Sequence, residues 1–300
     1  MEENQAMTNE QLESKLKSLR VKETITKILT YCAAVAMIIM WFFMDNLAMG
    51  LVFLAVALVF AYLSAKSSST LKKLLSDNII SGVLKKALGD TVEYNPWGKV
   101  EPGYMAFPFS YNKVSGSDHI KAVYKGLNIE LSDIELINEE EYTDENGNTQ
   151  KNSQTFFKGQ WLICDFGKEL SGEVRLSAND KKLRKQHKND SVEMENETFN
   201  NRFLVTAQNA QEAYYILTPH MMEYILSMAD KSGGDVYMSF FRDGKMHVAV
   251  KTGRDFFELG KSKANTDNLR QKFLNELKWF TDIVDTLRVE DTLYRKETNV

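Results

Sequence analysis

Two long apolar stretches near the N-terminus dominate the hydropathy pattern of the chain. They cover residues 28–44 and 47–65, and neither contains a charged side chain. As helices they would be about 26 and 28 Å long, close to the roughly 30 Å hydrocarbon core of a bilayer. Only Asp45 and Asn46 separate them, so the pattern predicts a transmembrane helical hairpin. A hairpin buried in a soluble bundle is less favoured, because such helices normally carry a polar face.

Amphipathic helical patterns flank this hairpin on both sides. Residues 1–27 predict a short amphipathic helix that leads into the first span. Residues 66–95 predict a juxtamembrane helix that begins at Ser69 or Thr70 as N-cap. Its apolar side chains form one stripe, and Gly89 is suited to end it.

The pattern changes to the alternation of half-buried strands in residues 96–300. A polar hairpin loop is expected over residues 139–154, with Asn146-Gly147 as turn former, and a second hairpin at Asp243-Gly244. A helix closes the chain from about Thr266. Strands are predicted at residues 120–137, 155–167, 172–178, 202–208, 213–218 and 235–250.

This mixture predicts an α+β fold class: a mostly antiparallel β domain with a few helices. One topology that fits is a partly closed barrel with the C-terminal helix over one end. The corner after residues 213–217 combines Thr218 as N-cap, Pro219 at the first helical position and His220 in the first turn. His220 could serve as a ligand or base, but no partner is placed by sequence, so a structural joint is favoured.

Basic residues around the two spans set the expected orientation. They flank the spans on their outer sides, whereas the short turn has none: Lys15, Lys17, Arg20, Lys22 and Lys27 precede the first span, and Lys66, Lys72, Lys73, Lys85 and Lys86 follow the second. The positive-inside rule then places both termini in the cytoplasm, with the hairpin in the plasma (inner) membrane.

The charge balance bears on the kind of partner, and the cysteines bear on the possibility of disulfides. Residues 1–66 hold six basic and six acidic side chains, so the whole net charge of −4 comes from residues 67–300. A mildly acidic domain does not indicate a nucleic-acid partner. Cys32 lies in a span and Cys164 is alone in the soluble part, so no disulfide framework is available.

One strongly basic run stands out in the soluble part. It consists of Lys181, Lys182, Arg184, Lys185 and Lys188, and Glu193, Glu195 and Glu197 follow it. The run could contact the anionic inner leaflet or an acidic partner. A solvated loop whose two halves compensate each other is the favoured alternative, because the acidic residues follow so closely.

Catalytic and metal-binding patterns are not found. The four histidines, His119, His187, His220 and His247, are not within metal-ligand spacing of one another or of Cys164. Cys164 lies in an apolar run, where a cysteine is usually a small buried residue. We therefore expect no catalytic, cofactor or metal site. The alternative is a membrane-tethered enzyme whose site is assembled from residues far apart in sequence.

Residues 198–259 resemble an uncharacterised bacterial membrane family, domain of unknown function 3137 (DUF-3137). The residues that carry the resemblance are Ala213-Tyr-Tyr-Ile-Leu-Thr-Pro and the Met-rich helix after it, with further similarity at 115–136 and 156–166. The resemblance implies an N-terminal helix, a two-span hairpin and a cytoplasmic domain without an established activity. It also implies a protein partner, with LemA-type membrane proteins as candidates. We therefore expect a binding or scaffold module anchored in the membrane.

Overall fold

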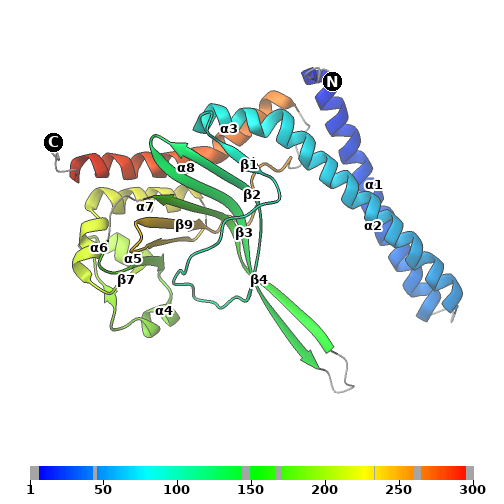
Figure 1. The fold of residues 1–300 in the computed structure, drawn as a ribbon. Helices are drawn as coiled ribbons and strands as arrows, with labels where there is room; N and C mark the ends of the chain where they lie inside the picture. The colour runs from blue at the N-terminus through cyan, green and yellow to red at the C-terminus, as the bar shows by residue number, and fades with distance from the viewer. Residues whose placement is uncertain are drawn as a thin grey trace. The chain divides into compact units, whose positions relative to one another are not determined.

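The computed structural model describes residues 7–42, 46–143, 149–165, 170–232, 234–259 and 265–294, the last nine of these by their backbone alone. The chain forms two compact units. Unit 1 comprises Met1–Val83 and Leu259–Phe273, and unit 2 comprises Leu84–Glu258 and Leu274–Val300. Figure 1 shows the helices and strands of both units.

Two long helices make up most of unit 1, as the hydropathy pattern predicts. Helix α1 runs over Asn9–Phe42 and helix α2 over Leu47–Leu75, and they lie side by side (Figure 1). By length and composition, α1 and the helical stretch Leu47–Leu88 could each cross a membrane, and only 11% of the most apolar part of each is buried. The apolar side chains of these helices therefore face outward. The amphipathic segment expected before the first span is the beginning of α1 itself.

The predicted start of the juxtamembrane helix at Ser69 or Thr70 is wrong, because α2 continues through these residues without a break. The hydroxyls of Ser67 and Thr70 donate to the carbonyls of Leu63 and Lys66, at 2.9 and 2.8 Å. Hydroxyls that bond back to the preceding turn do not act as caps, so the helix continues. A π-helical turn η1 (Ser76–Ile80) and helix α3 (Ser81–Leu88) follow directly, and Gly89, at φ +96°, ends the helix as expected.

The segment Leu259–Phe273 joins unit 1 through the start of helix α8 (Thr266–Tyr294). Glu13 of α1 accepts hydrogen bonds from the backbone N–H and the hydroxyl of Thr266, at 2.8 and 3.0 Å. A carboxylate at a helix N-terminus also interacts favourably with the helix dipole. Glu13 therefore connects α1 with the start of α8.

Unit 2 is built on a nine-stranded sheet in which every pair of neighbouring strands is antiparallel. In spatial order the strands are β1 (Glu93–Asn95), β2 (Lys113–Tyr124), β3 (Leu127–Thr143), β4 (Thr149–Asp165), β9 (Lys245–Val250), β8 (Val236–Phe240), β5 (Val174–Ala178), β7 (Phe203–Ala207) and β6 (Ser191–Val192).

This sheet confirms the antiparallel α+β fold class, but it is not closed. Among the described strands, β1 pairs only with β2 and β6 only with β7, so both edges are open and no barrel forms. The expected Asp243-Gly244 hairpin is present between β8 and β9, with Gly244 at φ +76°. A second tight turn, Lys125-Gly126, joins β2 to β3 with both residues at positive φ, which is the geometry of a type I′ turn.

The helices of unit 2 include one that the sequence pattern assigns wrongly. They are α4 (Lys181–Gln186), α5 (Glu197–Arg202), α6 (Ala210–Ile216), α7 (Pro219–Ser232) and the later part of α8. Residues 213–218 are not a strand, because Asn209 caps a helical turn by accepting from the Gln211 N–H at 3.0 Å. Ala213 and Ile216, three residues apart, are then buried on one side of α6. The predicted cap of α7 is confirmed, since Thr218 accepts from the Met221 N–H at 3.2 Å.

Helices α7 and α8 run across the same side of the sheet (Figure 1). Their inner faces are apolar and fully buried: Met221, Met222, Ile225 and Met228 on α7, and Leu277, Phe280, Ile283 and Val284 on α8. Lys125, in the β2–β3 turn, forms an ion pair with Asp285 of α8 at 2.5 Å. The main core of unit 2 therefore lies between the sheet and these two helices.

Strand β4 approaches the chain after β9 so closely that only glycine fits at position 159. A Cβ atom on Gly159 would lie 2.0 Å from the carbonyl oxygen of Val250. We expect Gly159→Ala to lower the free energy of unfolding by about 2 kcal/mol or more, because the backbone of β4 must shift. Urea unfolding of the detergent-purified chain, followed by tryptophan fluorescence, measures this.

The control is the same substitution at Gly82 in helix α3. A Cβ there meets nothing within 4 Å, and the residue is exposed. Gly82→Ala should therefore stabilise the chain by up to about 1 kcal/mol through helix propensity. Equal effects of the two substitutions would contradict the close approach of β4.

Candidate functional site

An irregular segment, residues 96–111, lies over one face of the sheet, and we call it the strap. Register pairing puts Ser132, Ser239 and His247 on that face, on strands β3, β8 and β9. Three hydrogen bonds join them to the strap: Val100 N–H to Ser132 Oγ (3.0 Å), Gly103 N–H to His247 Nδ1 (3.1 Å) and Ser239 Oγ to the Tyr104 carbonyl (3.0 Å). The polar strand residues thus pair backbone groups that secondary structure leaves without partners.

Aromatic packing holds the strap as well. The Phe107 ring lies 4.7 Å from that of Tyr237 and 6.0 Å from that of Phe157, measured between centroids. Both partners are fully buried on the sheet. The Arg175 guanidinium stacks over the Tyr104 ring at 4.6 Å, a cation–π geometry. The strap is therefore fixed on the sheet by polar and apolar contacts together.

His247 is the centre of the strap's polar contacts. Its Nδ1 atom accepts from the Gly103 N–H at 3.1 Å and from the Trp161 indole N–H at 3.2 Å. An atom that accepts from two N–H groups carries no proton, so the proton of the neutral ring is on Nε2. Burial lowers the pKa of His247 to about 4. At neutral pH the ring is an uncharged acceptor that positions the strap.

A second buried network forms around Asp133 of β3. Its two carboxyl oxygens accept from Gln160 Nε2 at 3.0 Å and from the Phe256 N–H at 2.7 Å. Gln160 Nε2 also donates to the Arg254 carbonyl, and Gln160 Oε1 accepts from the Thr252 hydroxyl, both at 2.8 Å. Burial raises the pKa of Asp133 well above its ordinary value. This network fixes the irregular segment 252–256 against the sheet, as the strap's network does on the other face.

The two residues that the sequence suggested as chemical candidates lie apart from both networks. Cys164 is fully buried in β4, where burial raises the pKa of its thiol to about 12, so it is protonated at neutral pH. His220 is exposed in the first turn of α7. Within the described ranges, no group of three or more His, Cys, Asp or Glu side chains is arranged to hold a metal ion.

Most of the basic run falls on the short helix α4 rather than in a loop, and Lys188 lies in the turn after it. Asp180 caps this helix by accepting from the N–H groups of Lys182 and Leu183, at 2.8 and 3.1 Å. All five basic side chains, Lys181, Lys182, Arg184, Lys185 and Lys188, are exposed. Arg184 donates to the side chain of Asn179 and to the carbonyl of Asn200, so it serves the local structure. The four lysines present a basic surface of unit 2.

The most exposed element of unit 2 is the far end of the β3–β4 hairpin. Residues 138–143 of β3 pair with residues 149–154 of β4, and we call these six pairs the arm. Among the described strands, β2 pairs with β3 only as far as Ile137, and β9 pairs with β4 only as far as Gln160. The arm therefore extends about 20 Å beyond its neighbours, at 3.4 Å per residue. Figure 1 shows it projecting from the sheet.

Asn112 marks the point where the arm leaves the sheet. Its side chain accepts from the Glu139 N–H at 2.9 Å and donates to the Glu139 carbonyl at 2.8 Å, as a neighbouring strand would. Beyond it the side chains are polar apart from Tyr142, which is 54% exposed. The polar loop expected over residues 139–154 is thus mostly paired strand, because the β3–β4 register continues through Thr143. The expected Asn146-Gly147 turn lies outside the described residues.

Sequence reasoning did not single out His247, Asp133 or the arm. The partners of His247 and Asp133 are distant in sequence, as Gly103 and His247 are 144 residues apart. A local signal existed for Asp133, which takes the next position in the alternation of apolar residues that begins at Ile129 and Leu131. For the arm the sequence indicated a hairpin but not its paired length, since a polar β-ribbon and a polar loop have similar composition.

The low pKa of His247 predicts a pH-dependent stability. The unfolded chain's histidine binds a proton near pH 6.5, whereas the folded state keeps His247 neutral down to about pH 4. This contribution is therefore fully present above pH 6.5 and is lost as the pH falls toward 4. Between pH 7 and 5 the free energy of unfolding should fall by about 2 kcal/mol on this account. Urea unfolding midpoints at the two pH values, with the m-value, measure it.

His247→Gln should remove most of this fall, and His220→Gln, at the exposed histidine, should retain it. An unchanged pH dependence in His247→Gln would show that another group causes it.

Comparison with known proteins assigns part of the chain to a family. No curated protein matches the chain. A solved structure that matches is described as the crystal structure of the mycobacterial trehalose monomycolate transport factor A, TtfA. It shares 9% sequence identity over 58% of this chain and 75% of that chain, with a TM-score of 0.29, which is too low for any inference. Residues 155–289 match the family model described as "Protein of unknown function (DUF3137)". The resemblance seen in the sequence is confirmed over this range.

Proposed function

We propose that this protein is a non-enzymatic binding module of the bacterial inner membrane, anchored by α1 and α2, which binds a protein partner through the arm. The exposed β3–β4 ribbon is the observation that carries the proposal. A two-stranded ribbon with no apolar face gains little stability of its own in water. An element that contributes so little to the core is better explained by what it contacts.

The chemistry of the arm favours a partner that adds a strand. Beyond Asn112, the described strands leave both outer edges of the ribbon without a neighbour. Such edges present backbone N–H and C=O groups to an incoming strand, which gives affinity without requiring apolar pockets. Tyr142 supplies an exposed aromatic ring of the kind enriched in protein interfaces. LemA-type membrane proteins are the candidate partners that the family resemblance suggests.

The basic flanks of the two helices support an orientation with both termini in the cytoplasm. Lys15, Lys17 and Lys22 precede the apolar part of α1 and are exposed. Lys66 directly follows the apolar part of α2, and it is also exposed. Lysines near the ends of membrane spans are retained on the cytoplasmic side. The arm and the DUF3137 domain would then face the cytoplasm.

This orientation predicts the behaviour of reporter fusions. A green fluorescent protein fused after Val300 should fluoresce, and an alkaline phosphatase at the same place should be inactive, because phosphatase folds only in the periplasm. The matched control is an insertion between Asn46 and Leu47, in the turn between the helices, where phosphatase should be active. Active phosphatase at the C-terminus would overturn the proposed orientation.

Shortening the arm tests its role in binding. Replacing residues 141–151 by Asn-Gly leaves the pair Glu140–Asn152 as the last of the ribbon, and none of the described residues that it removes is buried. A complex extracted from native membranes should lose the partner's mass in this variant on a native gel. The free energy of unfolding should change by less than about 0.5 kcal/mol, as for other surface changes.

A photo-reactive amino acid gives a second measurement on the intact arm. Placed at Tyr142, it should form a discrete crosslinked product in native membranes, whereas at Tyr215, an exposed tyrosine on α6, it should not. A full-size complex in the shortened variant, or equal products from both positions, would contradict binding through the arm.

A further inference from the structure

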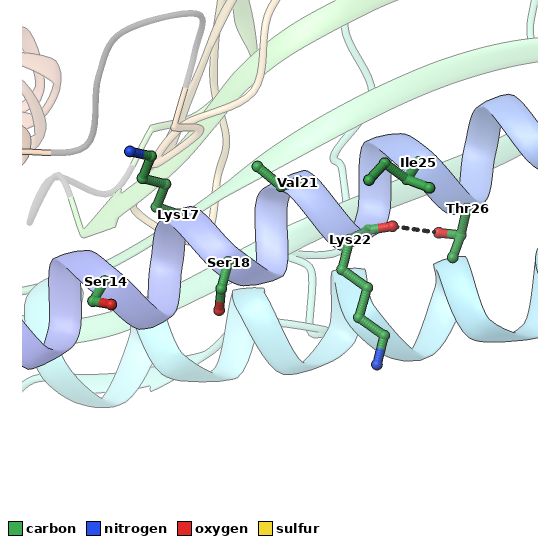
Figure 2. A pocket seen from close by; sticks show the side chains of 7 residues that line it. All are labelled: Ser14, Lys17, Ser18, Val21, Lys22, Ile25 and Thr26. Atoms are coloured by element: carbon green, nitrogen blue, oxygen red, sulfur yellow. Dashed lines mark hydrogen bonds between the residues drawn. The ribbon is translucent and has the colours of Figure 1, made fainter.

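Helix α1 carries a shallow groove of about 530 Å³ on its outer face, shortly before its apolar part begins. It is lined by Ser14, Lys17, Ser18, Val21, Lys22, Ile25 and Thr26. The surface is hollow at Ser14 and Ser18 because serine side chains are small. Val21 and Ile25, 51% and 50% exposed, supply an apolar floor. In Figure 2, Lys17 and Lys22 point to opposite sides of the helix, and Val21 and Ile25 lie on the side toward which Lys17 points.

The apolar floor continues into the apolar part of α1. Val21 and Ile25 are followed on the same face by Ile28, Cys32 and Val35, at alternating spacings of three and four residues. All five side chains are exposed. A hydrocarbon chain along this face would pass from the groove onto the apolar helix without meeting a charged group. From Ile28 back to Val21, the groove therefore lengthens the exposed apolar face of α1 by about 10 Å, at 1.5 Å per residue.

The charges around the groove favour an anionic occupant. No acidic side chain lines it, whereas Lys17 and Lys22 do. Glu10 and Lys15 together line an adjoining hollow that shares Ser14 and Ser18 with the groove. The two acidic residues nearest to the groove in sequence have partners. Glu23 forms an ion pair with Lys27 at 2.7 Å, and Glu13 accepts from Thr266. A second copy of α1 fits poorly, because lysines would face lysines across such an interface.

We propose that this groove binds an anionic phospholipid from the cytoplasmic leaflet. The ammonium groups of Lys17 and Lys22 attract the phosphate group from the two sides of the groove, and one acyl chain follows Val21 and Ile25 onto the apolar face. Lys22, the groove lysine nearer the apolar stretch, lies six residues before Ile28, about 9 Å along the helix, which is comparable with a headgroup layer roughly 5–7 Å thick. The inference rests on the proposed function, since it requires α1 to enter the membrane.

The test uses the full chain, extracted in mild detergent and incubated with phosphatidylglycerol or with phosphatidylcholine of the same acyl chains. Native mass spectrometry then measures the retained lipid. The wild-type chain should retain phosphatidylglycerol in preference. The variant Lys17→Gln with Lys22→Gln should bind it about 25-fold more weakly, because each lysine near an anionic lipid contributes a factor of about five.

Two further variants separate the groove from a general effect of charge. Lys181→Gln with Lys182→Gln makes the same charge change on the exposed surface of α4 and should leave retention unchanged. Ser18→Trp fills the hollow without altering charge and should weaken retention of phosphatidylglycerol. Unfolding midpoints equal to that of the wild type show that each variant is folded.

Several outcomes overturn the proposal. These are equal retention of the two lipids, equal loss in the α1 and α4 double variants, or full retention in Ser18→Trp. Loss of a co-purified protein from the α1 variant with lipid retention unchanged would assign the groove to an acidic protein instead. If the reporter fusions show two spans but no lipid preference exists, only this inference fails. If they show that α1 does not enter the membrane, the proposed function fails first.

Discussion

The antiparallel pairing of β3 with β4 is the constraint on which the rest of unit 2 depends. The two strands are paired from Ile129–Cys164 at one end to Thr143–Thr149 at the other. Strand β2 adds to one side of this pair and β9 to the other. Because the register fixes which side chains share a face, it also decides where every buried polar group of the two strands is placed.

Both irregular segments of unit 2 are anchored to this pair. Ser132 and Trp161 lie directly opposite each other on one face. Ser132 accepts from the strap, and Trp161 donates to His247, which in turn contacts the strap. Asp133 and Gln160, the next pair, hold segment 252–256 on the other. A slip of one residue would exchange the two faces and leave these buried groups without partners, which is energetically costly. Polar residues inside the sheet therefore specify the register as well as the positions of the loops.

The same strand pair also links the core to the surface proposed for binding. Where its apolar positions end, the ladder passes a register shift between Leu136 and Ile137 and continues as the arm. The lipid groove proposed on α1 uses different physics, since it depends on helix periodicity and on lysines beside exposed apolar side chains.

The sequence by itself determined the features whose physical causes lie within a few residues. The apolar length of α1 and α2, the Thr218 cap of α7 and the Asp243-Gly244 hairpin are of this kind, because hydropathy, capping and turn chemistry act locally. Local patterns can also predict the wrong element. A strand was predicted at residues 213–218, whereas the Asn209 cap begins a helix just before them. The open sheet and its strand order, the arm, and the roles of His247 and Asp133 were decided only by the tertiary structure. Each depends on partners that the chain brings together from far apart, as Gly103 and His247 show, and neither composition nor periodicity records such pairings.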